Sequence, residues 1–345
     1  MPTVSFVRWV PHNACAETDC FVGAGSHDMF GDASGARAVT PGSYGMAPGA
    51  FRLPDATRLG RVSLQVADLT RSLRFYEGVL GLRSVEREIS RAVLAAHGDD
   101  TPLVELHERA GARPAPTRGQ LGLYHFAILL PDRASLGRFA QHLGEVGAQA
   151  GAADHLVSEA FYLQDPDNLG IEVYSDRPRS AWRRNGLKLM MATDPVDIAG
   201  LLHAAGGVPW SGMPAGTVMG HVHLHVGDIA PASSFYSEGL GLDRTVWDYP
   251  GALFMSAGGY HHHLGTNIWA GHGAVAAAEQ DARLLEWTME LPDAASVVAA
   301  GESLVRAGYS TESGSRNADT HDLVVRDPWG TQLRICVSAA SPTAR

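Results

Sequence analysis

The chain has 345 residues, and its 45% hydrophobic and 19% charged residues are typical of a globular protein large enough for two domains. Its formal net charge of −10 argues against nucleic acid and anionic membranes as partners, because both bind basic surfaces. No run of about 18 apolar residues occurs, so we expect no membrane-spanning helix. The first residues lack the charged start and apolar core of a signal peptide, which predicts a cytoplasmic protein.

Residues 1–57 differ in composition from the rest of the chain. They are rich in Gly, Ala, Ser and Pro and show no sustained hydrophobic period, so we expect a flexible N-terminal extension. A regular pattern begins at Leu59 and continues to about residue 338. We therefore place the first domain at 58–180, a connector with a short helix at 181–217, and the second domain at 218–338.

The regular part of the chain is an internal duplication. VADLTRSLRFYEGVLGL at 66–82 recurs as VGDIAPASSFYSEGLGL at 226–242, and QDPDNLGIE at 164–172 recurs as RDPWGTQLR at 326–334. Each copy divides again, so the sequence predicts four similar units at about 59–108, 121–175, 218–270 and 283–338. In each unit a strand ends in Asp, an amphipathic helix follows, and three shorter strands close the unit.

The periods within the units support these elements. HVHLHV at 221–226 alternates strictly, which predicts a strand with His221, His223 and His225 on one face. In the first unit, Ser72, Phe75, Tyr76 and Val79 fall at helical spacing, and Gly81 ends the helix.

These motifs resemble the vicinal oxygen chelate superfamily of glyoxalases, bleomycin-resistance proteins and extradiol dioxygenases. Four stretches are similar to bacterial ring-cleaving enzymes of the catechol 2,3-dioxygenase type: LYHFAILLPDR (123–133), SEAFYLQDPDNLGIEVYSDRPRS (158–180), MGHVHLHV (219–226) and SAGGYHHHLGTNIWAG (256–271). The resemblance covers about residues 57–338. It implies an α+β fold of four βαβββ modules that pair into two partly open β-barrels, with metal ligands on the first and last strands.

The ligand-equivalent positions separate the four units into two sets. Units two and three offer His125, Glu172, His221 and His263, whereas units one and four offer Arg61, Glu105, Glu286 and Arg334. A guanidinium group does not deprotonate in proteins, so the second set cannot bind a metal and we expect ion pairs there. We infer that unit two pairs with unit three, and unit one with unit four. Sequential pairing, which would split the ligands between two incomplete sites, is the alternative.

Two histidines and one carboxylate with open positions are the ligand set of oxygen-activating Fe(II) enzymes. The predicted ligands are therefore His125, His221 and Glu172, with Fe(II) as the cofactor and Mn(II) as the alternative. Without the repeat and the resemblance, a lone histidine on a strand is more often a core residue than a ligand.

The run His261–His263 is predicted to lie on a strand, with His261 and His263 facing one way and Tyr260 and His262 the other. The resemblance then implies that His263 is an acid–base histidine beside the metal, assisted by His155 and Tyr162 from the partner unit. A surface loop for His155 and a packing role for Tyr162 are the alternatives. We also expect three further side chains to line the substrate pocket, namely His223, His261 and Asn267.

The predicted function is an extradiol dioxygenase that inserts O₂ into catechol or a related aromatic diol, in the breakdown of aromatic hydrocarbons. One alternative is a metal-dependent isomerase or lyase of the glyoxalase type, although His263 in place of a second carboxylate argues against it. The other is a non-catalytic binding protein, a class that commonly lacks the metal ligands. Fold alone does not choose among them. A homo-oligomer is compatible with the sequence.

Overall fold

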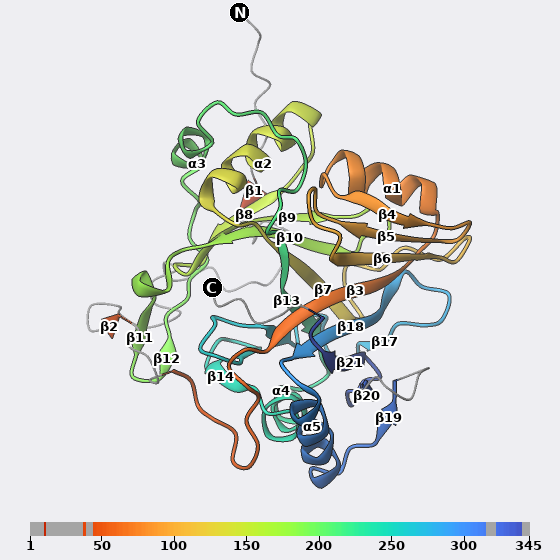
Figure 1. Cartoon of the computed structure of the whole chain (residues 1–345), viewed down its shortest axis with the longest axis vertical. Helices are drawn as coiled ribbons and strands as arrows, with labels where there is room; N and C mark the ends of the chain where they lie inside the picture. The colour runs from red at the N-terminus through yellow and green to blue at the C-terminus, as the bar shows by residue number, and fades with distance from the viewer. Residues whose placement is uncertain (1–9, 12–36, 39–43, 315–321, 340–345) are drawn as a thin grey trace, which may run out of the picture.

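The computed structural model describes residues 10–11, 37–38, 44–314 and 322–339. Two large curled sheets form its frame: one combines the consecutive units two and three, and the other combines units one and four from the two ends of the repeat region (Figure 1). In one sheet β7 (Gln120–Leu129) pairs with β13 (Val218–His225); in the other β3 (Arg58–Val66) pairs with β18 (Arg283–Leu291). Unit two thus pairs with unit three and unit one with unit four, as inferred, and sequential pairing is wrong. The predicted α+β class of four paired βαβββ units is confirmed.

The ten-stranded sheet contains units two and three. Its order is β1-β8-β9-β10-β7-β13-β16-β15-β14, with β17 added on β7. Unit two supplies β7, α2 (Arg133–Val146), β8 (Gly151–Asp154), β9 (Ser158–Gln164) and β10 (Gly170–Asp176). Unit three supplies β13, α4 (Ile229–Ser233), the π-helix η4 (Ser234–Gly239), β14 (Asp243–Val246), β15 (Ala252–Ser256) and β16 (Leu264–Asn267). Short strands β1 (Val10–Pro11) and β17 (Val275–Ala276) complete it.

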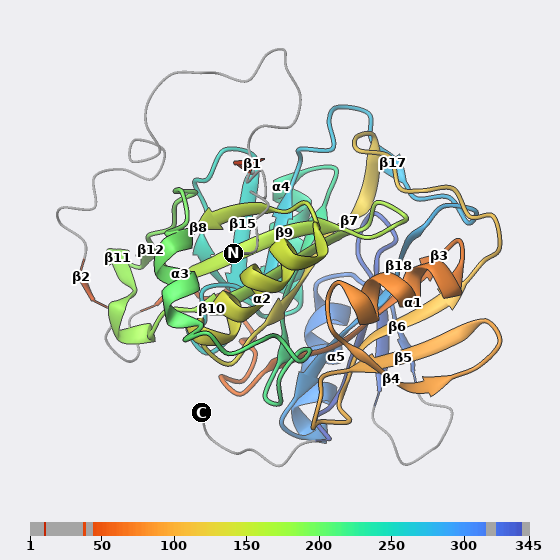
Figure 2. The same ribbon diagram turned by 90° about the horizontal axis from the view of Figure 1, so that it is seen from above.

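The eight-stranded sheet contains units one and four, in the order β19-β20-β21-β18-β3-β6-β5-β4. Unit one supplies β3, α1 (Leu69–Gly78), β4 (Arg83–Arg87), β5 (Arg91–Ala95) and β6 (Pro102–Glu108). Unit four supplies β18, α5 (Ala294–Arg306), β19 (Thr311–Ser313), β20 (Leu323–Arg326) and β21 (Gln332–Val337). Figure 2, seen from above, shows α1 and α2 in front of the strands, and Figure 1 places α4 and α5 on the opposite side.

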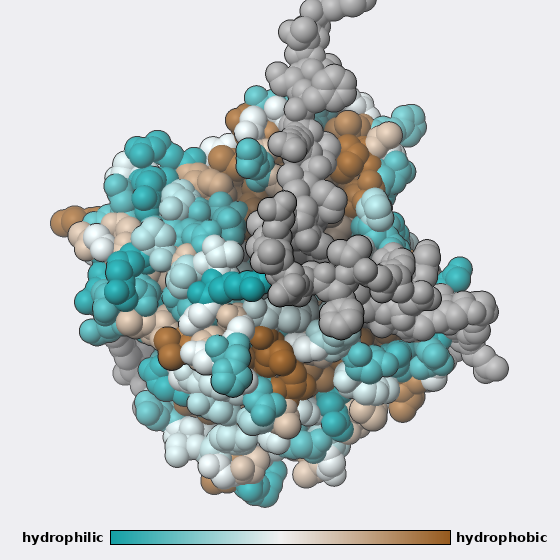
Figure 3. All heavy atoms as spheres, turned by 180° about the vertical axis from the view of Figure 1, so that it is seen from behind, coloured by the Kyte–Doolittle hydropathy of each residue, from teal (hydrophilic) through white to brown (hydrophobic). Residues whose placement is uncertain are grey.

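The connector forms its own small elements. They are η3 (Arg179–Ala181), β11 (Arg183–Asn185), β12 (Lys188–Leu189) and α3 (Ile198–Ala204), and β11 also pairs with β2 (Arg37–Ala38). Within the described residues no helix is long and apolar enough to span a membrane. On the face shown in Figure 3, hydrophilic residues are interspersed with smaller hydrophobic areas.

An Asp at the end of each first strand starts the helix of its unit. The side chains of four such residues accept a hydrogen bond from a backbone N–H in the first helical turn, namely Asp68, Asp132, Asp228 and Asp293. This N-cap satisfies a donor that the helix itself leaves unpaired. The repeated Asp in the sequence therefore marks the same strand-to-helix turn in all four units.

Two buried tyrosine–aspartate contacts join consecutive units across the two sheets. The Tyr76 hydroxyl of α1 donates to Asp165 over 3.2 Å, and the Tyr236 hydroxyl of η4 donates to Asp327 over 2.9 Å. Burial raises the pKa of Asp165 to about 6, and it also raises the pKa of Asp327. These contacts join unit one to unit two and unit three to unit four, whereas strand pairing joins unit two to unit three and unit one to unit four.

Residues 44–57 pack against unit three, although their composition predicted flexibility. Leu53 is 2% exposed, and its backbone N–H donates to the Gly241 carbonyl. The Arg52 guanidinium pairs with the buried Asp243 carboxylate over 2.6 Å. These anchors lie among Gly and Pro residues and leave no hydrophobic period to recognise. The remainder of the predicted extension, apart from residues 10–11 and 37–38, lies outside the described residues.

Candidate metal centre

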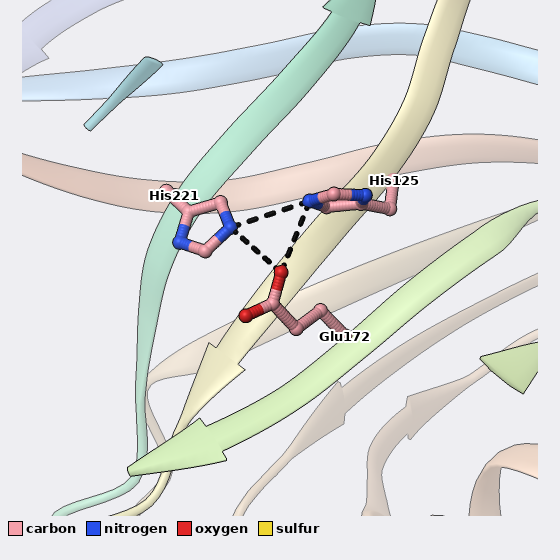
Figure 4. Close-up of side chains that lie close together, drawn as sticks. All are labelled: His125, Glu172 and His221. Carbon is pink, nitrogen blue, oxygen red and sulfur yellow. Dashed lines mark hydrogen bonds and ion pairs between the residues drawn. The ribbon is translucent and has the colours of Figure 1, made fainter. Parts of the chain in front are cut away.

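Two imidazoles and one carboxylate converge on the concave face of the ten-stranded sheet (Figure 4). His125 Nε2 lies 3.1 Å from Glu172 Oε2, and His221 Nε2 lies 3.0 Å from the same oxygen. The two Nε2 atoms are 3.3 Å apart. The structure therefore brings together the three residues that the sequence predicted as ligands. Their role as ligands remains a prediction.

Strand register explains the convergence. β10 runs parallel to β7 with Glu172 beside Ala127, and β13 runs antiparallel to β7 with His221 beside the same Ala127. His125 lies two residues before Ala127 on β7, so its side chain points to the same face. The small Ala127 side chain, itself fully buried, leaves the space above it for the three larger groups.

The spacing of the donor atoms fits a divalent transition metal. Ligands about 2.1 Å from one ion and about 90° apart lie about 3.0 Å from each other, whereas a tetrahedral angle separates them by about 3.4 Å. The observed separations of 3.0, 3.1 and 3.3 Å are closer to the first value. This donor set suits three protein ligands on one side of an ion, with positions left for other ligands.

The electrostatics also fit a cation. Glu172 is 2% exposed, and within the described residues its ion-pair partners are His125 and His221. Burial by itself opposes ionisation of this carboxyl group, but the two imidazoles outweigh it and hold the pKa of Glu172 well below its usual value. Burial lowers the pKa of both histidines, although the Glu172 carboxylate acts to raise it. A carboxylate and two neutral imidazoles are the forms that bind a metal.

A cavity lies beside these donors. Its aromatic walls are formed by Tyr124, Tyr249, Phe254 and Trp269, and the connector contributes Met191, Ala192 and Thr193. His155, Tyr162, His223 and His262 supply polar atoms, and no lysine or arginine is among the described lining residues. Tyr124, Tyr249, Phe254 and the connector segment were not predicted from the sequence, because none of them shows a period or motif typical of a pocket.

The histidine run is where the structure corrects the prediction. Residues 258–263 are not a strand: Gly258 and Gly259 have φ of 60° and 67°, and β16 begins only at Leu264. Strand alternation therefore does not apply. His262, not His263, lines the cavity, and its ring lies against that of His221 with centroids 4.0 Å apart and the planes tilted by 42°.

The other two histidines of the run lie outside the cavity lining. The His263 ring accepts a hydrogen bond from the Ala257 N–H through Nδ1, at 3.1 Å. His261, predicted as a pocket residue, is fully buried and bonds to Asp176 and His262 instead. The pair Gly258–Gly259 is the sequence signal that would have identified the turn, because two left-handed residues interrupt a strand.

His155 and Tyr162 lie together on the cavity wall, as predicted. His155 Nδ1 is 2.7 Å from the Ala192 carbonyl oxygen, which can only accept, so Nδ1 carries the proton. His155 Nε2 lies within hydrogen-bond distance of the Tyr162 hydroxyl, at 2.6 Å. Burial, together with the nearby Glu172 carboxylate, holds the pKa of Tyr162 well above its usual value. Tyr162 is therefore a neutral phenol.

Asn267 contributes indirectly. It does not line the cavity, but its Nδ2 donates to His223 Nε2 over 3.0 Å, and His223 does line it. The Asn267 Oδ1 atom accepts from the Trp269 N–H and from His225 Nδ1, which fixes the direction of the amide. Asn267 thus orients a wall histidine rather than facing a substrate.

The corresponding positions of units one and four carry ion pairs, as predicted. The Arg61 guanidinium lies 3.0 Å from Glu105, and the Arg334 guanidinium lies 2.8 Å from Glu286. Units two and three therefore carry residues that can bind a metal at these positions, and units one and four carry ion pairs there.

The fold consists of paired βαβββ modules, and one pair surrounds a buried His–His–Glu cluster that could hold a metal ion. These two features define the class of protein. The chain belongs to the Glyoxalase/Bleomycin resistance protein/Dioxygenase superfamily, whose sequence profile matches residues 58–173 and 218–335. It is 44% identical over 271 residues to a protein of Bacillus subtilis (strain 168) named catechol-2,3-dioxygenase, covering 78% of this chain and 94% of the relative.

Solved structures agree on the fold. A putative dioxygenase from Bacillus subtilis subsp. subtilis str. 168 aligns with a TM-score of 0.57 at 13% identity, over 85% of this chain and 87% of that one. A glyoxalase I mutant from Zea mays aligns with a TM-score of 0.50 at 17% identity, over 81% and 92%. At these identities the likeness concerns the fold alone.

Proposed function

We propose that the chain is an extradiol ring-cleaving dioxygenase, which inserts O₂ into catechol or a related aromatic diol. The observation that carries this proposal is the three-donor cluster, whose open side faces an aromatic cavity equipped with proton-transfer groups. The 44% identity to a relative named catechol-2,3-dioxygenase supports the same reaction. We infer Fe(II) as the cofactor, with Mn(II) as the alternative.

His125, His221 and Glu172 would hold the ion. Bound there, Fe(II) supplies the redox chemistry through which O₂ reacts with an aromatic diol. The cavity walls would position the substrate ring. Tyr124, Tyr249 and Phe254 present flat apolar surfaces to a planar ring and exclude water from it.

The diol has to lose a proton as it binds, and His262 is placed to accept it. Burial holds the pKa of His262 well below its usual value, so the ring is neutral and has a lone pair available. The Tyr162 hydroxyl, held 2.6 Å from His155 Nε2, also lines the cavity and can hydrogen-bond to a diol hydroxyl. We therefore transfer to His262 the acid–base role that the sequence suggested for His263.

The test is to add catechol in air to the Fe(II)-loaded protein and to record the absorbance of the yellow ring-opened semialdehyde. We expect colour from the wild type, none from Glu172→Ala or His221→Ala, and retained colour from the matched variant Glu286→Ala of the ion-paired site. No colour from catechol or from a panel of substituted catechols would refute the proposal.

The same experiment separates the alternatives. A glyoxalase-type isomerase would convert its substrate without consuming O₂, which an oxygen electrode measures directly. A non-catalytic binding protein would bind a diol and return it unchanged. The cluster of the described residues has three donor groups rather than four, which favours a site that shares its ion with an external substrate.

A further inference from the structure

A hydrogen-bonded chain leads from the cavity toward the surface through the histidine run. His262 Nδ1 lies 2.7 Å from His261 Nδ1, and His261 Nε2 lies 2.9 Å from Asp176 Oδ1. His261 is fully buried, whereas the Asp176 side chain at the end of β10 is 24% exposed. The run therefore contains one cavity histidine and a second histidine that connects it to a carboxylate.

Hydrogen-bond chemistry decides where the protons lie in this chain. A carboxylate can only accept, so His261 Nε2 carries the proton that bonds to Asp176. In neutral His261 the other nitrogen, Nδ1, is then an acceptor, and His262 must donate to it from Nδ1. This leaves His262 Nε2 as the nitrogen with a lone pair.

Surrounding contacts hold the connecting residues in place. The Tyr260 hydroxyl donates to Asp176 Oδ1 over 3.3 Å, and the Thr245 hydroxyl donates to the His261 carbonyl over 2.8 Å. The Trp182 ring packs edge-on against His261 with centroids 5.4 Å apart. Turning the His261 ring so that Nδ1 faces away from His262 would break its hydrogen bond to Asp176 and its packing against Trp182.

We propose that Asp176, acting through His261, is a positioning residue that fixes the ring and tautomer of His262, so that His262 Nε2 faces the cavity as the proton acceptor. The inference rests on the proposed function for the identity of that proton, which comes from the bound diol. An acid that holds a histidine in its working tautomer is a known catalytic arrangement, here extended by one additional imidazole. It gives a role to His261, which is fully buried but does not line the cavity.

The tautomer can be measured without the metal or a substrate. We would record ¹⁵N spectra of metal-free protein labelled at histidine, with the His262 signals assigned by their absence in His262→Gln. We expect protonated Nδ1 and unprotonated Nε2 in the wild type and in His261→Asn, whose amide oxygen can replace the Nδ1 acceptor. In His261→Phe and Asp176→Ala we expect the proton to move to Nε2. A wild-type His262 protonated at Nε2, or an unchanged His262 in His261→Phe, would overturn the proposal.

Steady-state kinetics supply the second readout. We expect His261→Phe and Asp176→Ala to lower kcat between about 10- and 100-fold, within the range of acid–base catalysis, with the KM for the diol and the bound iron unchanged. Because the two residues act in series, the double variant should lose no more than His261→Phe alone. Additive losses, a raised KM or lost iron would indicate a merely structural role. If the wild type cleaves no diol, the proposed function fails, while the tautomer measurement still tests this inference.

Discussion

His262 and His263 are neighbours in the sequence, and their opposite placements give a direct test of the site. We would compare His262→Gln with His263→Asn. Glutamine places a polar amide near the position of the His262 Nε2 atom, which lines the cavity, but an amide cannot accept a proton at neutral pH. Asparagine places its oxygen near the position of His263 Nδ1 and can still accept the hydrogen bond from the Ala257 N–H.

The expected losses of kcat in the two variants differ by orders of magnitude. Loss of a proton acceptor costs about 10²- to 10⁴-fold in rate. That range corresponds to about 3–5 kcal/mol of transition-state free energy at about 1.4 kcal/mol per tenfold change. His263→Asn keeps its backbone hydrogen bond, so we expect a kcat within about threefold of the wild type and a stability loss of no more than about 1 kcal/mol.

The assay is the initial rate of semialdehyde formation from catechol, with iron content and urea unfolding measured on each variant. Iron content separates loss of chemistry from loss of the cofactor, because the His262 ring contacts the ring of the predicted ligand His221. The reasoning is refuted if His263→Asn is inactive while His262→Gln, loaded with iron, keeps a wild-type kcat.

Three further predictions concern the metal, pH and packing. Glu172→Gln should weaken Fe(II) binding at least about 100-fold in a chelator competition, whereas Glu105→Gln of the ion-paired site should bind Fe(II) normally and lose only stability. The raised pKa of about 6 for Asp165 means that its stabilising contribution is complete below its unfolded pKa of about 3.8 and is lost as the pH rises through 6. Asp165→Asn should therefore remove a decrease of up to about 3 kcal/mol in unfolding free energy between pH 4 and pH 7, measured by urea titration, and an unchanged pH slope would contradict this. A Cβ on Gly220 would lie 1.9 Å from the Tyr174 hydroxyl, so Gly220→Ala should cost about 1–3 kcal/mol and displace the adjacent His221; an unaltered melting temperature and iron content would count against this packing.

The predicted ligands and unit pairing could be read from the sequence because repeats place equivalent residues on equivalent strands. Arg61 and Arg334 stood at ligand positions and could not bind a metal, which directed the remaining ligands to units two and three. This reasoning needs only strand register and side-chain chemistry. It selected residues that the structure brings together, because β10, β7 and β13 are regular where Glu172, His125 and His221 lie.

The placement of the histidine run depended on distant contacts that no local pattern contains. A Cβ on Gly259 would lie 2.8 Å from the Tyr44 ring, and Arg179 donates to the Gly258 carbonyl over 2.9 Å. Tyr44 comes from a segment whose composition suggested flexibility. The connector residues of the cavity wall, such as Met191, likewise reach the site through tertiary packing without any periodic signal.

The pairing of unit one with unit four, on either side of units two and three in the chain, has a consequence for synthesis of the protein. Val62 on β3 pairs with Trp287 on β18, so the edge of β3 has no partner strand until nearly all of the protein has been made. At about 5–20 residues per second, that interval is on the order of ten seconds or more. An open strand edge invites pairing with another chain. We therefore expect units two and three, whose strands are made earlier, to pair before unit one can pair with unit four.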